Sequence, residues 1–193
     1  KSVYGLLIHH ADVFAKPGVE YLIDSMEKLK EIGAVHKIGV SIYDAAQLDQ
    51  VLETFTPEIV QLPLNILDQR LILSGHIRAL KTQKVEIHLR SLFLQGLLLM
   101  ARDKISTRLS ALLPHLNKLH RALKEVDMTP LEACFLFALK SANFDAILTG
   151  LNSSDEMIEN FKVLNRIEGQ SFDFTPFAIN DYNIINPSNW PKT

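Results

Sequence analysis

The chain has 193 residues, of which 47% are hydrophobic and 22% charged, and its formal net charge is −2. These proportions are ordinary for a folded domain. Lysine and arginine residues are scattered along the sequence, so we expect no nucleic acid partner. No apolar run approaches the ~20 residues of a membrane span, so we expect no membrane partner. The single cysteine, Cys134, excludes an internal disulfide framework and favours a cytoplasmic location. Its apolar surroundings predict a buried, inert thiol.

Short apolar runs alternate with segments of helical periodicity along most of the chain. Strands are predicted over residues 3–8, 35–41, 58–62, 85–91 and 144–149. Helices are predicted between them, over residues 19–32, 45–55, 68–83, 109–126, 131–141 and 153–167. The strands are short and rich in β-branched residues, which is typical of a parallel sheet covered by helices. Residues 92–100 are predicted to form a buried loop, and the chain after residue 167 an irregular tail.

Three features refine the predicted helices. The apolar residues of the first helix, Leu22, Met26, Leu29 and Ile32, fall on one stripe. Asp44 and Thr129 are suitable N-caps for the helices that follow them. For the last helix either Ser153 or Ser154 could act as the cap.

The first strand ends abruptly in His9, His10 and Asp12. In parallel α/β folds the loops after the strands carry the chemistry, so these side chains are candidates for a reaction site. The alternative for this one strand end is a polar turn whose histidines are solvated or hydrogen-bonded. A metal site built from the three residues is disfavoured, because adjacent residues of a strand point in opposite directions.

Five strand ends together resemble one family. The segments are LLIHHAD (6–12), GAVHKIGVS (33–41), VQLPLN (60–65), SLFLQGLL (91–98) and TGLNS (149–153) with the following Glu159 and Asn160. In the same order they resemble the YLLHxPD, GkvraiGvSn, QveyNp, SPLgxGlL and iPGaxsxeqleeN segments of the aldo-keto reductases. Each motif alone is weak, but five in the right order identify the family.

The resemblance implies a partial (β/α)8 TIM barrel. The family barrel has eight strands and usually takes ~250 residues, whereas five strands are predicted here. They look like the fourth to eighth, with the N-terminal units absent. The family's Asp, Tyr and Lys therefore have no counterpart in these residues. We expect residues 1–167 to form the aldo-keto-reductase-like partial barrel and residues 168–193 the C-terminal tail.

The resemblance also implies roles at the strand ends. His9 matches the family histidine that orients the substrate carbonyl, and His10 is the alternative if the register slips by one residue. Ser41 and Gln61 match the residues that hold the nicotinamide carboxamide. Arg90 stands where the family often has an aromatic ring on the nicotinamide. It could stack there, although its charge would repel the oxidised ring, or it could bind an anionic group.

The remaining matched positions would hold the rest of the cofactor. The loop from Ser91 to Gly96 would run along the pyrophosphate, and the start of the last helix would meet the adenosine end. The expected cofactor-binding residues are Ser41, Gln61, Arg90, Ser91, Leu92, Gln95, Gly96, Gly150, Asn152, Ser153, Ser154, Glu156, Glu159 and Asn160. The carboxylates Asp155 and Glu156 would repel a 2′-phosphate, which gives a weak lean to NADH over NADPH.

The expected function is therefore that of an NAD(P)H-dependent oxidoreductase that reduces a small-molecule carbonyl to an alcohol. Without the family's tyrosine acid and lysine, the chain alone is expected to be inactive. The alternative is a non-catalytic partial barrel that binds a nucleotide or a partner. An open barrel exposes two sheet edges, so we expect self-association or a missing N-terminal segment that completes the barrel.

Overall fold

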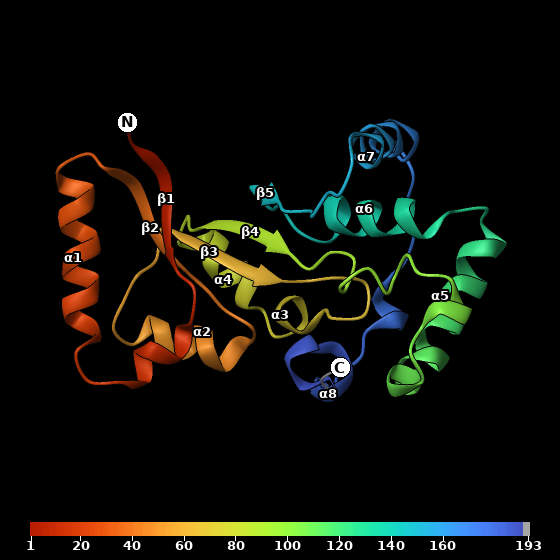
Figure 1. Ribbon diagram of the computed structural model, residues 1–193, viewed down its shortest axis with the longest axis horizontal. Helices are drawn as coiled ribbons and strands as arrows, with labels where there is room; N and C mark the ends of the chain where they lie inside the picture. Colours follow the sequence, from red (N-terminus) through yellow and green to blue (C-terminus); the bar gives the residue numbers. More distant parts are fainter. Residues whose placement is uncertain (191–193) are drawn as a thin grey trace. The chain divides into compact units, whose positions relative to one another are not determined.

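The structure is a computed structural model that describes residues 1–190. The three residues after Trp190, which belong to the predicted tail, lie outside the described residues. Five strands form one sheet in sequence order (Figure 1): β1 (Val3–Ile8), β2 (Val35–Ser41), β3 (Ile59–Pro63), β4 (Glu86–Arg90) and β5 (Ala146–Ile147). Strands β1 to β4 are paired in parallel. The predicted α/β fold, with a sheet of five strands in sequential order, is confirmed.

The α-helices lie between and after these strands. They are α1 (Val19–Glu31), α2 (Ala45–Leu52), α3 (Arg70–Leu73), α4 (His76–Thr82), α5 (Leu113–Glu125), α6 (Pro130–Ser141), α7 (Ser154–Arg166) and α8 (Tyr182–Ile185). Short 3-10 helices are η1 (Ala11–Ala15), η2 (Arg102–Lys104), η3 (Thr107–Leu112), η4 (Thr175–Phe177) and η5 (Pro187–Asn189). The predicted caps are confirmed, because the side chains of Asp44, Thr129 and Ser153 each accept a backbone N–H at the start of α2, α6 and α7.

The helix predicted over residues 45–55 ends at Leu52, and the one predicted over 109–126 is an α-helix only from Leu113. Two further elements differ more from the prediction. The single helix expected over residues 68–83 is divided into α3 and α4, because Gly75 takes a φ of 82° between them. Such a positive φ interrupts a helix and favours glycine. The last strand is also shorter than expected, since β5 contains only two residues.

The chain packs as two compact units. Unit 1 comprises Lys1–Pro63, Leu71–Arg90 and Phe144–Ala146, and unit 2 comprises Leu64–Arg70, Ser91–Asn143 and Ile147–Thr193. The predicted tail therefore belongs to unit 2, as far as it is described.

In unit 1 the two faces of the sheet have opposite character. One face is apolar and no more than 1% exposed, and it carries Ile38, Val40, Val60, Leu62, Ile87 and Leu89. Helix α1 contacts β2, and α4 contacts β4. The opposite face carries polar side chains at alternate positions, namely Lys37, Ser41, Gln61, Glu86, His88 and Arg90. Three functional candidates of unit 1, Ser41, Gln61 and Arg90, lie on this polar face.

The apolar stripe of α1 is mostly exposed. Met26 is buried at 4% exposure, but Leu22, Leu29 and Ile32 are 41%, 38% and 75% exposed. The helix packs on the sheet through a narrow line of contact, so the rest of its apolar face remains uncovered within the described chain. The spacing of apolar residues in a sequence shows which side of a helix is apolar. It does not show whether another element covers that side.

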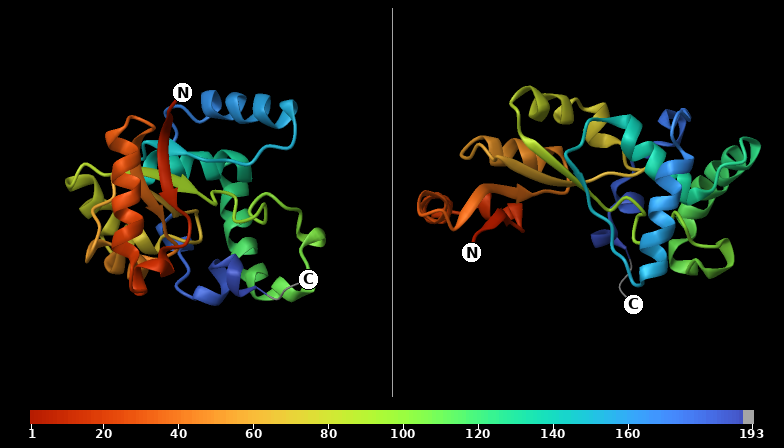
Figure 2. Two further views of the ribbon diagram at one scale, coloured as in Figure 1. Left: turned by 60° about the vertical axis from the view of Figure 1, so that its left-hand side comes forward. Right: turned by 90° about the horizontal axis from the view of Figure 1, so that it is seen from above.

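Unit 2 is organised around α6, whose residues from Glu132 to Ala138 are all buried. Helices α5 and α7 both contact it, and Figure 2 shows α7 alongside α6. Cys134 is fully buried, as predicted, and burial raises the pKa of its thiol. The tail has only short helices, yet Phe174 packs edge-to-face on Phe137, with ring centroids 5.5 Å apart. The tail is thus part of the core of unit 2.

Candidate functional site

Two predicted site residues of unit 1, Ser41 and Gln61, lie in one row across β2 and β3, and His9 directly follows the end of β1. Ser41 pairs directly with Gln61 in the sheet register. His9 follows Ile8, the partner of Val40, just as Ser41 follows Val40. The strands are parallel, so this row lies toward their common carboxyl edge, where α/β folds bind ligands. Gln61 in turn pairs with His88, which extends the row onto β4.

Arg90, the last residue of β4, lies two residues beyond this row. Its Nη2 donates a 3.0 Å hydrogen bond to the carbonyl oxygen of Ile42, and its Cζ lies 4.4 Å from the ring centroid of Tyr43. Burial lowers the pKa of the Arg90 guanidinium, and the contact with Tyr43 opposes that shift. The backbone N–H of Tyr43 donates to the Gln47 side chain of α2. The guanidinium therefore has a defined orientation between the ends of β2 and β4.

His9 and His10 contact each other. Nδ1 of His9 lies 3.3 Å from Nε2 of His10, and their rings meet edge-to-face with centroids 4.5 Å apart. The alternation expected of adjacent strand residues does not apply to these two histidines, because β1 ends at Ile8 and the chain turns into η1. Among residues 1–190, no three His, Cys, Asp or Glu side chains are placed to hold a metal ion.

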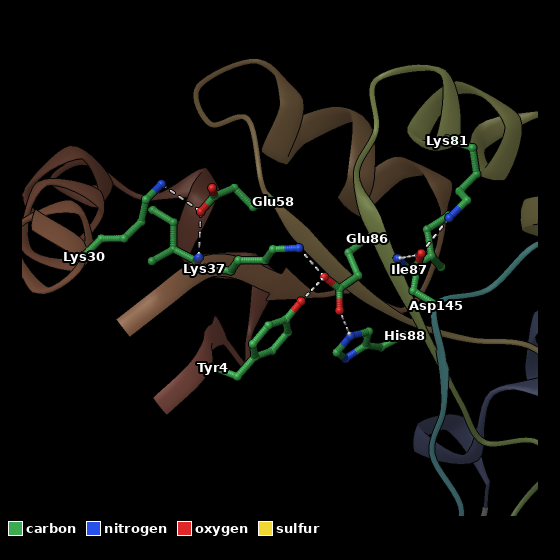
Figure 3. Close-up of polar contacts among 10 residues, drawn as sticks. Tyr4, Lys30, Lys37, Glu58, Lys81, Glu86, Ile87, His88 and Asp145 are labelled. Carbon is green, nitrogen blue, oxygen red and sulfur yellow. Dashed lines mark hydrogen bonds and ion pairs between the residues drawn. The ribbon is translucent and has the colours of Figure 1, made fainter. Parts of the chain in front are cut away.

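A second polar cluster lies on the same sheet, nearer the amino ends of its strands (Figure 3). The Glu86 carboxylate accepts hydrogen bonds from the Tyr4 hydroxyl at 2.6 Å, from Nε2 of His88 at 2.7 Å and from the Lys37 ammonium. Burial of Glu86 would raise the pKa of its carboxyl group, but the hydrogen bonds from Lys37, Tyr4 and His88 lower it to about 2. We name Tyr4, Lys37, Glu86 and His88 the Glu86 cluster.

The Glu86 cluster contains a tyrosine and a lysine, the residue types of the family's proton donor. Tyr4, however, lies at the start of β1, and its hydroxyl proton is directed to Glu86. A phenol that donates to a carboxylate is a poor proton donor to anything else. The Glu86 cluster therefore offers no tyrosine hydroxyl that is available as a proton donor.

In unit 2 the predicted pyrophosphate loop has an unusual backbone. Ser91, Leu94, Gln95 and Gly96 all have positive φ, at 61°, 46°, 56° and 83°. Such conformations are strained for residues other than glycine and are commonly found at functional sites. A Cβ at Gly96 would meet nothing within 4 Å, so a ligand can approach its backbone. Leu92 and Leu94 are buried, so Leu92 could meet a ligand only through its backbone.

Asn65 organises this loop from the segment after β3, and its role was not anticipated from the sequence. Its side chain is buried, and Oδ1 accepts hydrogen bonds of 3.0 Å from the backbone N–H groups of Leu67 and Asp68. Nδ2 donates to the carbonyl oxygen of Ser91 at 3.4 Å. The only signal for this role in the sequence was the position of Asn65 in the VQLPLN segment (60–65), which also contains Gln61.

The predicted adenosine-binding residues surround the start of α7. The Ser153 hydroxyl accepts the N–H of Glu156 at 3.2 Å, and the Glu156 carboxylate accepts the N–H of Asn152 at 2.7 Å. This reciprocal cap already uses two of the backbone donors that could have met an anion. Glu159 is paired with Arg166. Gly150 and Ser154 are exposed, and Asn160 is half-buried.

A family model described as the Aldo/keto reductase family matches residues 3–173. The chain belongs to the aldo/keto reductase family. Comparison with curated proteins found no match. None of the helices within residues 1–190 is long and apolar enough to cross a membrane.

Solved aldo-keto reductase structures have the same fold. Aldo-keto reductase AKR11C1 from Bacillus halodurans, in its apo form, is 18% identical over 92% of this chain and 62% of its own, with a TM-score of 0.68. Thermostable Tm1743 in complex with epalrestat is 18% identical over 89% and 56%, with a TM-score of 0.61. A Gox0644 variant in complex with NADPH is 16% identical over 93% and 60%, with a TM-score of 0.58. This aldo/keto reductase chain thus spans less than two thirds of each of these three structures.

Proposed function

We propose that this chain carries the carboxyl-terminal part of an NAD(P)H-dependent oxidoreductase that reduces a small-molecule carbonyl to an alcohol. The observation that supports it best is that Ser41 and Gln61 pair toward the carboxyl ends of β2 and β3 while His9 follows the carboxyl end of β1, in a chain of the aldo/keto reductase family. We assign the five strands to the fourth to eighth of a (β/α)8 barrel, with the partial barrel running to residue 167.

The proposed roles in unit 1 follow from the row. A bound reduced nicotinamide supplies hydride to the carbonyl carbon. His9 orients the carbonyl and donates a hydrogen bond to its oxygen as negative charge develops there. Ser41 and Gln61 hold the carboxamide of the cofactor. Arg90, held by its contacts with Ile42 and Tyr43, lies beside either the nicotinamide ring or an anionic group of the ligand.

The proposed roles in unit 2 concern the rest of the dinucleotide. The backbone from Ser91 to Gly96, with Leu92 and Gln95 between them, would follow the pyrophosphate. The start of α7 would meet the adenosine end through Gly150, Asn152, Ser153, Ser154, Glu156, Glu159 and Asn160. Because Glu156 caps the helix, a 2′-phosphate that met this end of α7 would face a carboxylate. This supports the lean to NADH.

The chain alone is proposed to be inactive as a reductase. The family's Asp, Tyr and Lys have no matching residues, and the hydroxyl of Tyr4 is engaged by Glu86. Loss of one general acid typically lowers a rate ~10²–10⁴-fold. The buried Cys134 suits the reducing cytoplasm proposed as its location.

The alternative is a partial barrel that binds a partner, and exposed apolar residues favour it. Helix α1 exposes Tyr21, Leu22, Leu29 and Ile32, and helix α7 exposes Met157, Ile158 and Phe161. A second copy or an N-terminal segment of a longer protein would cover such surfaces. Sedimentation velocity over a range of concentrations separates a monomer from a self-associating chain.

The function is tested by titrating the chain with NADH and NADPH while following their fluorescence, and by assaying aldehyde-dependent oxidation of both. We expect saturable binding that weakens at least tenfold in Gln61→Leu. Gln83→Leu, an exposed site at the end of α4, serves as the matched control. Absence of binding, both in the chain and in any longer protein that its gene encodes, would refute the proposal.

A further inference from the structure

The contact between His9 and His10 requires one of two proton arrangements. A neutral imidazole has one N–H and one bare nitrogen, so only one of the two rings can donate across the 3.3 Å separation. If His10 Nε2–H donates to His9 Nδ1, then His9 carries its proton on Nε2. If His9 Nδ1–H donates to His10 Nε2, then Nε2 of His9 is bare and can only accept.

The backbone of His10 is anchored, so the contact is more than a chance meeting of two exposed rings. Its carbonyl oxygen accepts the N–H of Val13 at 3.3 Å, at the beginning of η1. Within η1, Phe14 is buried and stacks on Phe55, with ring centroids 5.9 Å apart. The turn that places His10 beside His9 is therefore attached to the core of unit 1.

We propose that His10 is a positioning residue, which donates from Nε2–H to Nδ1 of His9 and so keeps the proton of His9 on Nε2. This arrangement places both rings in the Nε2–H form, the commoner tautomer of free histidine, whereas the reverse places both in the rarer form. The inference rests on the proposed function, in which His9 must donate to a carbonyl oxygen. The partner of one ring nitrogen sets the proton of the other.

The test is the histidine ring ¹⁵N spectrum of the 193-residue chain at alkaline pH, where imidazole is neutral. His9→Ala assigns the signals. We expect His9 to show a protonated Nε2 and a bare Nδ1. In His10→Ala, the two His9 nitrogen frequencies should move toward each other as the second tautomer becomes populated. His10→Gln, which can present an amide N–H, should restore the wild-type frequencies.

His36→Ala is the control, because His36 is exposed on β2 and interacts with Ser2. A His9 that carries its proton on Nδ1, or frequencies that do not change in His10→Ala, would overturn the inference. The spectrum requires neither cofactor nor substrate, so failure of the dinucleotide titrations would refute the proposed function without altering this result. Unchanged thermal unfolding of His10→Ala would show that the frequency change is not a loss of fold.

Discussion

The hydroxyl of Tyr4 donates a 2.6 Å hydrogen bond to Glu86, although the two residues belong to β1 and β4, which are not neighbouring strands. Adjacent strands are ~4.8 Å apart, so β1 and β4 would be separated by about 14 Å in a flat sheet. The two long side chains together span most of this distance, and β1 also contacts β3, so the sheet curves between them. This curvature forms within unit 1.

The Glu86 cluster should make stability depend on acid pH. The folded pKa of Glu86, about 2, lies below its ordinary value of 4.5, so its stabilisation is complete above pH 4.5 and is lost as the pH falls toward 2. A shift of this size corresponds to about 3 kcal/mol at most. In urea titrations at neutral pH, Glu86→Gln should lower the free energy of unfolding by about 2–3 kcal/mol.

The difference between wild type and Glu86→Gln should close as the pH approaches 2. Glu125→Gln, at the exposed end of α5, serves as the control. If the difference persists at pH 2, the ionised state of Glu86 is not the source of the stabilisation.

Asn65 should be important for the stability of unit 2. Removal of its buried side chain in Asn65→Ala leaves the N–H groups of Leu67 and Asp68 without their acceptor. Each buried unsatisfied group costs about 1–3 kcal/mol, so we expect a loss of about 2–4 kcal/mol in the free energy of unfolding. Thermal and urea unfolding measure it. The control is Asn189→Ala, at an exposed site, which should change the free energy of unfolding by less than about 0.5 kcal/mol. Equal losses in Asn65→Ala and Asn189→Ala would contradict the role of Asn65.

Gly39 should tolerate no side chain. A Cβ at this position would lie 2.0 Å from the carbonyl oxygen of Ile59, so Gly39→Ala must separate β2 from β3. We expect Gly39→Ala to be unfolded or aggregated in circular dichroism and size-exclusion measurements. Gly150→Ala is the matched control, since its Cβ meets nothing within 4 Å. A folded Gly39→Ala with wild-type stability would show that the strands are not as close as described.

The cofactor preference can be tested at the cap of α7. If the Glu156 carboxylate disfavours a 2′-phosphate, Glu156→Gln should bind NADPH more tightly relative to NADH, by about fivefold for ~1 kcal/mol. Glutamine retains an oxygen that can accept the N–H of Asn152, so the cap is preserved, whereas Glu156→Arg removes it. Fluorescence titrations with both dinucleotides give the ratio. A tenfold preference of the wild type for NADPH would instead point to Arg102 or Arg108 in the long loop after β4.

The sequence predicted the elements whose signals are local. The strands β1 and β2 have the predicted bounds, and Asp44 and Thr129 cap their helices, because alternating segments and caps depend on neighbouring residues. The order of the strands followed from the short connections between them.

Features that depend on tertiary geometry were not predictable. The turn after Ile8, which brings His10 onto His9, depends on the packing of η1. The pairing of Arg90 with Tyr43 joins two strand ends that are not adjacent in the sheet, and nothing in either segment indicates the other. The exposure of the α1 stripe depends on what lies beside the helix. The assigned roles of the site residues remain predictions.

The short strand β5 depends on a side chain for much of its attachment to β4. Oδ2 of Asp145 accepts the N–H of Ile87 at 2.7 Å and also pairs with Lys81, while the N–H of Asp145 donates to the carbonyl oxygen of Ile87 (Figure 3). Few backbone bonds hold this strand, so its amides should exchange with solvent through local opening. Amides between β2 and β3 should exchange only when the whole unit opens. We therefore expect the carboxylate of Asp145 to limit how often the last strand detaches while the rest of the sheet stays closed.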